Sequence, residues 1–491
     1  MATDLLPALL SKIVERRGDS SQYISVKQLE KEGSLFVQDG NHGNNRPRQN
    51  EFSTEGTPFV QPPNLIGGEV DFAKCGMINE KAFLRIRKGI GRKGDILITT
   101  NATIGRKSIV KQNAPEPFVV NPQITIWRSL DSEKIDQRYL YYFMSDSSFM
   151  NQLWSFCGDN STFNYVSLSL QKKIFLSLPK ICEQKAIAHI LGTLDDKIEL
   201  NRQMNQTLET IAQALFKSWF VDFDPVIDNA LAAGNDIPDE LKYRATARQA
   251  LGDQRKPLPP EIQRQFPDKF VLSEEMGWIP EGWKAGSIAS ICTVKGGYAY
   301  KSKDFTSVGC PVIKIKNINA DRSLNVDDIQ HIPQSIAEQT KNFWLKTGDL
   351  LMAMTGATVG KYGLLVTKNR NTYLLNQRVA KFQPLDGVSK NIWFAYCVLK
   401  EEIAINYIVN VAHGSAQPNI SADEIMAAPL IAPSLSLVQR FDEHVDPYFQ
   451  KTLVNQALSY KLGSIRDTLL PKLMSGELRV PEAEKLVGEA V

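Results

Sequence analysis

Two long stretches of the chain place apolar residues at alternating spacings of four and three, the pattern of a helix that buries one face in a coiled coil. The first covers residues 183–220 without a proline and predicts a helix of about 60 Å. The second covers 437–470 and contains Pro447, which we expect to interrupt its first turns and to kink it. The seam positions are Ile187, Leu191, Leu194, Ile198, Asn201, Asn205, Leu208, Ala212, Leu215 and Trp219 in the first stretch, and Phe441, Tyr448, Asn455, Leu458, Leu462, Ile465 and Leu469 in the second.

Each predicted helix has a single apolar face, so we expect the two to pack on each other as an antiparallel pair. Asn201, Asn205 and Asn455 fall within the seams. A buried amide there fixes the register of the pair, and it costs stability unless it finds a partner amide. The alternative is that each helix packs only on its own domain.

A different pattern precedes each helix. Short runs with strand-forming residues are cut by Gly, Pro and Asn, which predicts compact α/β (α+β) units dominated by short twisted strands. These runs are 95–100, 108–112, 117–120 and 123–127 in the first unit, and 349–354, 363–367 and 378–383 in the second.

The two units are copies of each other. Residues 93–107 recur as 347–361 with one inserted residue. A repeat of about half the chain indicates a duplicated domain pair, which we expect to be related by a pseudo-two-fold axis across the helices. Further corresponding segments, at an offset near 254, are 121–123 with 376–378, 161–164 with 415–419, and Pro179 with Pro433.

Residues 355–361, TGATVGK, look like a phosphate-binding loop of a nucleotide hydrolase. Such a loop needs four residues between its glycines and a Ser or Thr after its lysine. Here three residues separate Gly356 from Gly360, and Tyr362 follows Lys361. The first copy, NATIGRK, also lacks the first glycine. We therefore interpret the motif as a strand and turn of each unit and expect no cofactor.

Composition narrows the class of protein further. The hydrophobic content of 43% and the charged content of 23% are ordinary for a globular protein. No run of about 18 apolar residues occurs, and the first twenty residues lack a basic start and a cleavage site, so we expect a cytoplasmic protein without a membrane partner. Six scattered cysteines and five scattered histidines argue against a disulfide framework, a metal site or a catalytic triad.

The net charge of +3 is unevenly distributed. Residues 1–180 carry +5 and residues 281–433 carry +4, so acidic segments lie outside the two units. Two basic segments suggest two domains that bind a polyanion. The residues between them, 224–280, are rich in proline and charge, and we expect a crossover connection there.

Three segments closely resemble the DNA specificity subunit of type I restriction-modification systems. They are 192–225 (GTLDDKIELNRQMNQTLETIAQALFKSWFVDFDP), 276–283 (MGWIPEGW) and 465–480 (IRDTLLPKLMSGELRV). The resemblance covers nearly the whole chain and implies two target-recognition domains separated by long helices. The boundaries that it implies are 1–180 for the first recognition domain, 181–223 for the central long helix, 224–280 for the crossover connection, 281–433 for the second recognition domain, and 434–491 for the C-terminal helix and tail.

The same resemblance implies a function. Each domain would read one half of a split double-stranded DNA target, and the helices would set the unread spacer. The helices would also dock two methylation subunits, and the assembly would recruit two restriction and translocation subunits. In that family the specificity subunit performs neither methylation nor cleavage.

The residues agree with a non-catalytic chain. An adenine methyltransferase needs [DNS]-P-P-[YFW] to hold the flipped base, and this chain offers only QPPN and LPPE. Residues 238–242, PDELK, lack the strand that separates the acids of a PD…ExK nuclease, and we interpret them as a helix start capped by Asp239. Two alternatives stay open, a fused or stand-alone methyltransferase or nuclease, and a helical scaffold that does not read DNA.

A DNA-binding domain needs cations for phosphates and amides or guanidinium groups for base edges. In the first domain we expect contacts from the polar loop 41–50, and from 85–93, which holds five cations and no acid. A mobile loop and a solvated face are the alternatives. The candidates are Asn44, Arg46, Arg48, Arg87, Lys88, Arg92 and Lys93, with Arg106 and Lys107 in the turn that matches Lys361.

In the second domain, aromatic residues alternate with lysines over 295–303, and residues 314–319 form a candidate strand with exposed polar positions. Packing at a strand edge is the alternative for the tyrosines. Lys361 follows the glycine turn, where a cation suits a phosphate contact better than base reading. The remaining candidates are Tyr298, Tyr300, Lys301, Lys303, Lys316 and Asn317.

Overall fold

The computed structural model describes residues 22–157, 165–254, 258–368, 372–413 and 418–488. Two compact units divide the chain, one formed by residues 1–198 with 461–491 and the other by 199–460. The first twenty residues and most of the predicted correspondence between 161–164 and 415–419 lie outside the described residues.

Most secondary-structure elements of the first domain are short strands. They are β1 (Gln22–Ser25), β2 (Leu35–Asp39), β3 (Phe52–Ser53), β4 (Thr57–Val60), β5 (Leu65–Ile66), β6 (Glu69–Val70), β7 (Gly76–Ile78), β8 (Ile90–Gly91), β9 (Ile96–Thr99), β10 (Lys107–Ile109), β11 (Phe118–Val120), β12 (Ile124–Ser129) and β13 (Phe175–Leu178). The helices are α2 (Val26–Lys31), α3 (Glu80–Arg85), α4 (Gln137–Phe143), α5 (Ser147–Ser155) and α6 (Leu168–Gln171).

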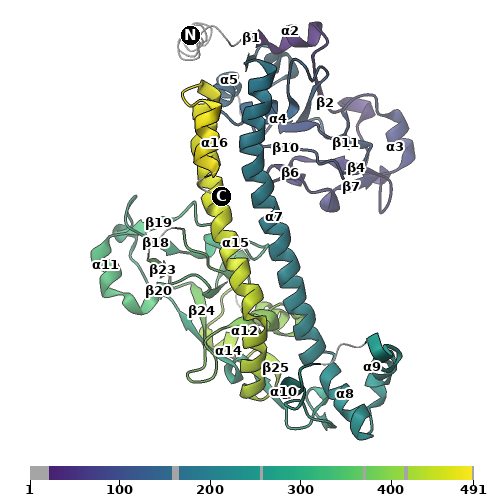
Figure 1. The fold of residues 1–491 in the computed structure, drawn as a ribbon, viewed down its shortest axis with the longest axis vertical. Helices are drawn as coiled ribbons and strands as arrows, with labels where there is room; N and C mark the ends of the chain where they lie inside the picture. Colours follow the sequence, from purple (N-terminus) through teal and green to yellow (C-terminus); the bar gives the residue numbers. More distant parts are fainter. Residues whose placement is uncertain (1–21, 158–164, 255–257, 369–371, 414–417, 489–491) are drawn as a thin grey trace. The chain divides into compact units, whose positions relative to one another are not determined.

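These strands form two main sheets. The order of the antiparallel four-stranded sheet is β10-β9-β12-β2, and that of the five-stranded sheet is β3-β7-β4-β11-β8, with β11 parallel to β4. Every residue of the inner strand β9 is buried, which explains its nearly continuous apolar run. β1 pairs with β13. Figure 1 shows the strands of this domain beside the N-terminal half of the long helix that follows it.

The second domain repeats this arrangement. Its strands are β16 (Lys284–Ser287), β17 (Cys292–Gly296), β18 (Cys310–Ile313), β19 (Gln330–Ile332), β20 (Trp344–Leu345), β21 (Leu350–Ala353), β22 (Tyr362–Leu364), β23 (Tyr373–Leu375), β24 (Val379–Pro384) and β25 (Pro429–Ala432), and its helices are α11 (Gln334–Gln339), α12 (Trp393–Val398), α13 (Glu402–Ala412) and α14 (Ala422–Met426). The sheet orders are β17-β24-β21-β22 and β19-β18-β23-β20, with β18 parallel to β23, and β16 pairs with β25. The matching sheets confirm the predicted duplication, although β3 and the pair β5-β6 have no strand counterpart among the described residues of the second domain.

The TGATVGK motif is the turn of a β-hairpin. β21 pairs with β22 as β9 pairs with β10, and the carbonyls of Lys361 and Arg106 accept equivalent hydrogen bonds of 2.8 Å. Gly360 has a φ of +79° and Gly105 a φ of +87°, so both copies need glycine before the second strand. The left-handed position earlier in the turn is Gly356 in one copy and Ala102 in the other. The motif serves backbone geometry, as predicted.

Two long helices, α7 (Ile181–Phe220) and α15 (Leu435–Ser475), correspond to the predicted seams. In the second unit the Asn455 amide donates to the Asn205 side-chain oxygen at 2.9 Å, and the Asn201 amide donates to the Ser459 hydroxyl at 3.2 Å. These contacts confirm the antiparallel register that the asparagines predicted. The expectation that Pro447 interrupts the helix was wrong, because α15 continues through it.

Both long helices pack on the second domain as well as on each other. Trp219 and Phe220 of α7 contact Phe441 of α15, with ring centroids 5.7 and 5.3 Å apart. Phe394 of α12 lies 4.8 Å from Phe220 and 5.9 Å from Phe441. The same core therefore holds the helix pair together and attaches it to the second domain, and the alternative that each helix packs only on its own domain was wrong here.

The connection after α7 is largely helical. It contains α8 (Asp224–Ala233), α9 (Asp239–Ala250), α10 (Pro260–Gln263) and the hairpin of β14 (Phe270–Ser273) with β15 (Gly277–Pro280). Arg244 pairs with buried Asp224 at 2.7 and 2.8 Å, which clamps α9 onto α8. Residue 239 starts α9, but Pro238 occupies the N-cap and its side chain makes no cap bond, so the predicted Asp cap was wrong. The chain's last helix is α16 (Val480–Gly488).

Candidate nucleic-acid interface

The fold brings together the two basic segments of the first domain. Buried Asn41 accepts hydrogen bonds from the backbone N–H groups of Arg87 and Lys88, both at 3.2 Å, and donates to the Lys88 carbonyl. The predicted polar loop therefore lies beside the predicted cationic segment. We call the exposed side chains of Arg46, Arg48, Arg87 and Lys88 the first-domain basic surface.

Arg85 positions this surface. Its guanidinium makes a bidentate pair with Glu51 at 2.7 and 2.6 Å and donates to the Arg46 carbonyl at 3.3 Å. The Arg85 guanidinium, with the Arg48 N–H, lowers the pKa of Glu51 to about 2, so the pair stays charged over the physiological range. The charge of Arg85 is thus neutralised by Glu51. The four exposed cations of the surface, in contrast, have no ion-pair partner among the described residues.

The backbone of the cationic segment 85–93 also passes very close to the backbone at the end of β2. Gly89 has a φ of +67°, and a Cβ built there would lie 2.6 Å from the Cα of Gly40. The Gly89 N–H donates to the Gln38 side chain at 2.9 Å. Glycine is therefore required where the cationic segment crosses the end of β2.

Arg92 and Lys93 are exposed in the turn before β9. Fully buried Asp95 holds this turn by accepting from the Arg92 N–H at 2.7 Å, and it pairs with Arg128 at 2.6 and 2.7 Å. Burial raises the pKa of Asp95 although the Arg128 pair opposes this shift. The hydrogen bonds of Asp95 fix the conformation of the turn, which leaves both cations exposed.

Arg106 and Lys107 are adjacent in the sequence but have different environments. Arg106 is exposed and donates to the Pro62 carbonyl at 3.4 Å. Lys107 is half-buried, with its ammonium 5.1 Å from the centre of the Tyr141 ring. Burial, together with nearby Arg466, lowers the pKa of Lys107 to about 8. Lys107 thus lies among side chains of the helices, which does not favour the phosphate contact that the sequence suggested.

The aromatic residues of the second domain form a cluster at one end of the sheet. Tyr298 is exposed and packs on Tyr300 and Phe343, with ring centroids 5.0 and 5.5 Å away. Tyr300 is buried, and its hydroxyl lies 3.1 Å from the Thr340 hydroxyl. Tyr298 stays accessible to a ligand, whereas Tyr300 supports it from the core. Lys301 and Lys303 next to the cluster are exposed.

Of the two candidates in the 314–319 segment, one is likewise exposed and the other buried. Lys316 is exposed and pairs with Asp328 at 3.0 Å. Asn317 is buried, and its amide donates to the carbonyls of Asn325 and Asp328, both at 2.9 Å. The segment is a 3-10 turn (Ile315–Asn317), so the predicted strand was wrong. Asn317 holds its own loop together and is not available to a base.

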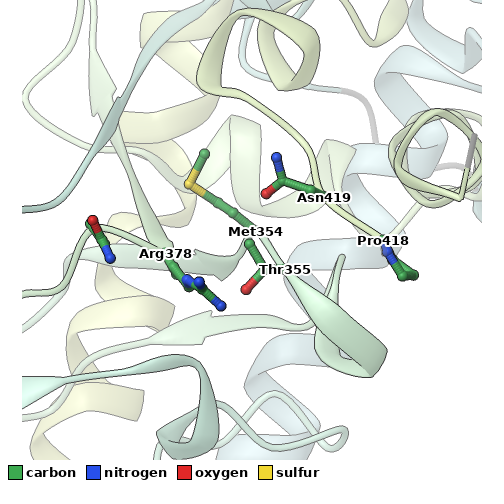
Figure 2. A pocket seen from close by; sticks show the side chains of 6 residues that line it. Met354, Thr355, Arg378, Pro418 and Asn419 are labelled. Carbon is green, nitrogen blue, oxygen red and sulfur yellow. The ribbon is translucent and has the colours of Figure 1, made fainter. Parts of the chain in front are cut away.

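A pocket of about 420 Å³ lies beside the TGATVGK turn. Three separate segments surround it, the end of β21, the residues before β24, and the residues before α14, as Figure 2 shows. Lys361, half-buried, follows the same turn. The residues that line the pocket are Met354, Thr355, Gln377, Arg378, Pro418 and Asn419.

None of these six residues was a candidate from the sequence. The signal was present, because 376–378 had been matched to 121–123 as part of the duplication. What the sequence could not show is that Arg378 is exposed beside Thr355 and Asn419, since the three positions come from different segments.

The chain matches a known protein family over both domains. The family model described as "Type I restriction modification DNA specificity domain" matches residues 36–210 and again 280–457. The chain belongs to this family. It therefore is a type I restriction-modification specificity subunit built from two copies of the DNA recognition domain.

The chain is also similar to individual proteins. The chain is 26% identical to the type I restriction enzyme HindI specificity subunit of Haemophilus influenzae, over 86% of this chain and 94% of that protein. It is 25% identical to the MjaIX specificity subunit of Methanocaldococcus jannaschii, over 87% of each. The crystal structure of the S subunit from M. genitalium aligns over 93% of this chain and 97% of that one, with 15% identity and a TM-score of 0.48.

Within the described residues, no helix is both long enough and apolar enough to cross a membrane. The same part of the chain contains no cluster of three or more His, Cys, Asp or Glu side chains arranged to hold a metal ion.

Proposed function

We propose that this chain is the non-catalytic subunit that reads a bipartite DNA target, with one recognition domain for each half-site. The observation that carries this proposal is the duplication. Two domains share one backbone arrangement down to equivalent hydrogen bonds, while their exposed polar side chains differ. Such a pair suits two half-sites of different sequence, because phosphate contacts position a domain and base contacts select its sequence.

The long helices are the proposed spacer. α7 has 40 residues and α15 has 41, and a helix of 40 residues is about 60 Å long. This length exceeds one DNA turn of roughly 34 Å, which suits half-sites on one face of the duplex with unread base pairs between them. A pseudo-two-fold relation of the domains across the helices belongs to this proposal, as do the boundaries 1–180, 181–223, 224–280, 281–433 and 434–491.

We further propose that the helices dock two methylation subunits, and that the full cytoplasmic complex holds two restriction and translocation subunits. An apolar stripe on α7 supports this proposal. Leu200, Met204 and Ile211 are 51%, 38% and 40% exposed. Their spacing of four and seven places them on one face of the helix, away from the seam that contains Asn201 and Asn205. An exposed apolar stripe on a long helix is typical of an interaction surface.

The test is methylation-site sequencing of DNA from a host that carries this chain with its methylation partner. We expect one motif with two defined half-sites separated by a fixed unspecified spacer. A single continuous motif, or no motif, would contradict the proposal and favour a scaffold that does not read DNA. Methyl transfer by the purified chain alone, measured with a labelled methyl donor, would instead show a fused enzyme.

A further inference from the structure

The duplication places Gln123 of the first domain and Arg378 of the second at the same backbone position. The Gln123 carbonyl accepts from the Thr100 N–H at 2.9 Å, and the Arg378 carbonyl accepts from the Met354 N–H at 3.0 Å. Each residue directly precedes an inner strand of its four-stranded sheet, β12 or β24. The offset is 255, as expected beyond the residue inserted in the second copy.

The neighbouring segments correspond as well. The N–H of Val166 donates to the Thr100 carbonyl, and the N–H of Ile420 donates to the Met354 carbonyl, both at 3.0 Å. Isolated antiparallel bridges join Asn101 to Tyr165 in the first domain and Thr355 to Asn419 in the second. The same three segments therefore meet at this point in both domains.

The side chains at this point differ although the backbone is the same. The first domain presents Asn101, Gln123 and Tyr165, whereas the second presents Thr355, Arg378 and Asn419. The neighbouring buried positions are apolar in both domains. Ile124 corresponds to Val379, and Val166 corresponds to Ile420. A fixed backbone with exchanged polar side chains is expected where two copies of a domain recognise different ligands.

Both central residues are free to bind. Gln123 and Arg378 are exposed, and neither side chain makes a hydrogen bond or ion pair within the described part of the chain. In the second domain Arg378 lines the 420 Å³ pocket together with Thr355 and Asn419 (Figure 2). The site therefore offers the exposed guanidinium of Arg378 beside the exposed amide of Asn419, whereas the Thr355 hydroxyl is buried and has no hydrogen-bond partner within the described part of the chain.

We propose that Gln123 and Arg378 are specificity-determining residues, each of which reads one base pair in the half-site of its own domain. A guanidinium matches the O6 and N7 acceptors of guanine, and a carboxamide matches the N7 acceptor and N6 donor of adenine. Arg378 accordingly selects guanine and Gln123 selects adenine. This inference rests on the proposed function, because it assigns residues to the half-sites.

The experiment uses the complex of the full chain with its methylation subunit and a DNA library randomised across both half-sites. Bound sequences are recovered and counted for the wild type, Arg378→Gln and Gln123→Arg. Lys390→Gln is the matched control, because Lys390 is an exposed cation beyond the other end of β24. Each complex is also titrated with its preferred duplex at several salt concentrations.

We expect Arg378→Gln to lose roughly 5- to 150-fold of its preference for guanine at one position of one half-site, the range of a bidentate contact. All other positions stay unchanged. Gln123→Arg shifts one position of the other half-site from adenine toward guanine. Lys390→Gln leaves both half-sites unchanged.

Two outcomes would overturn the inference. One is an unchanged preference at every position in both exchange variants. The other is equal weakening on all sequences with a salt slope lower by about 1, which identifies phosphate contacts. Recovery of no bipartite motif by the wild-type complex would instead contradict the proposed function, so the two failures are distinguishable.

Discussion

The side chains of Asn205 and Asn455 meet in the buried seam between α7 and α15, where the Asn455 amide donates to the Asn205 oxygen at 2.9 Å. Asn455 is 2% exposed, and the Asn205 amide donates in turn to the Thr452 carbonyl at 3.2 Å. The pair therefore satisfies groups that would otherwise be costly inside an apolar seam, and only one register of the two helices allows it.

Breaking this pair should destabilise the second unit. In Asn455→Ala the Asn205 oxygen loses its donor, and we expect the free energy of unfolding in urea to fall by about 1–3 kcal/mol. Val454→Ala, at an exposed position of the same turn, should change it by less than about 0.5 kcal/mol. Equal losses in the two variants would show that the amide pair is not the cause.

Exchanging glycine and alanine at the matching positions of the two hairpin turns should have opposite effects on stability. Ala102 has a φ of +58° where Gly356 has a φ of +70°. An alanine in this region costs about 1 kcal/mol relative to glycine, and the Gly356 site has no atom within 4 Å that an added methyl would meet. We expect Gly356→Ala to lower unfolding stability and Ala102→Gly to raise it. The same sign for both would contradict a backbone origin.

Lys107 should make stability depend on pH. Its pKa is lowered to about 8, mainly by burial and then by Arg466, so between about pH 8 and 10.5 the unfolded chain binds this proton more tightly than the native state. The contribution of Lys107 to the free energy of unfolding therefore rises as the pH increases across that window. Below it, the native state carries the full cost of the half-buried ammonium.

The test of this effect is Lys107→Met, with urea unfolding measured at pH 7 and pH 10. We expect the variant to be more stable than the wild type by about 1–3 kcal/mol at pH 7 and to lack the wild-type rise toward pH 10. Lys93→Met, at an exposed lysine before the same hairpin, should retain the rise. A rise that persists in Lys107→Met would assign it to another group.

The first-domain basic surface should bind phosphates and not bases. Arg87→Gln and Lys88→Gln should each weaken binding to all duplexes alike and lower the slope of log affinity against log salt by about 1. Lys31→Gln, an exposed lysine of α2, is the control and should leave the slope unchanged. Altered base preference without a change in slope would assign these residues to sequence reading.

The apolar stripe on α7 should be needed for the methylation subunit. Met204→Glu keeps a good helix former but places a charge in the proposed interface, and we expect affinity for that subunit, measured by calorimetry, to fall at least about tenfold. Gln206→Glu adds the same charge on a different, exposed face of the helix and should have little effect. Unchanged affinity in Met204→Glu would place the docking site elsewhere.

The sequence alone determined the features that depend on local pattern and on self-comparison. Spacings of four and three predicted α7 and α15, and the asparagines within those seams predicted the register seen at Asn205 and Asn455. The copied segments predicted two equal domains and the identity of the TGATVGK turn. Such features follow from chain periodicity and backbone geometry, which neighbouring residues largely set.

Only the tertiary structure decided which polar residues face outward. The side chains of Tyr300, Asn317 and Lys107 are of types that contact DNA. Tyr300 and Asn317 are nevertheless buried, and Lys107 is half-buried among the helices. Conversely, Asn41 reaches across 47 positions to fix Lys88, and Arg378 borders a pocket made by three separate segments. Exposure and convergence depend on contacts between distant parts of the chain, and no local pattern records them.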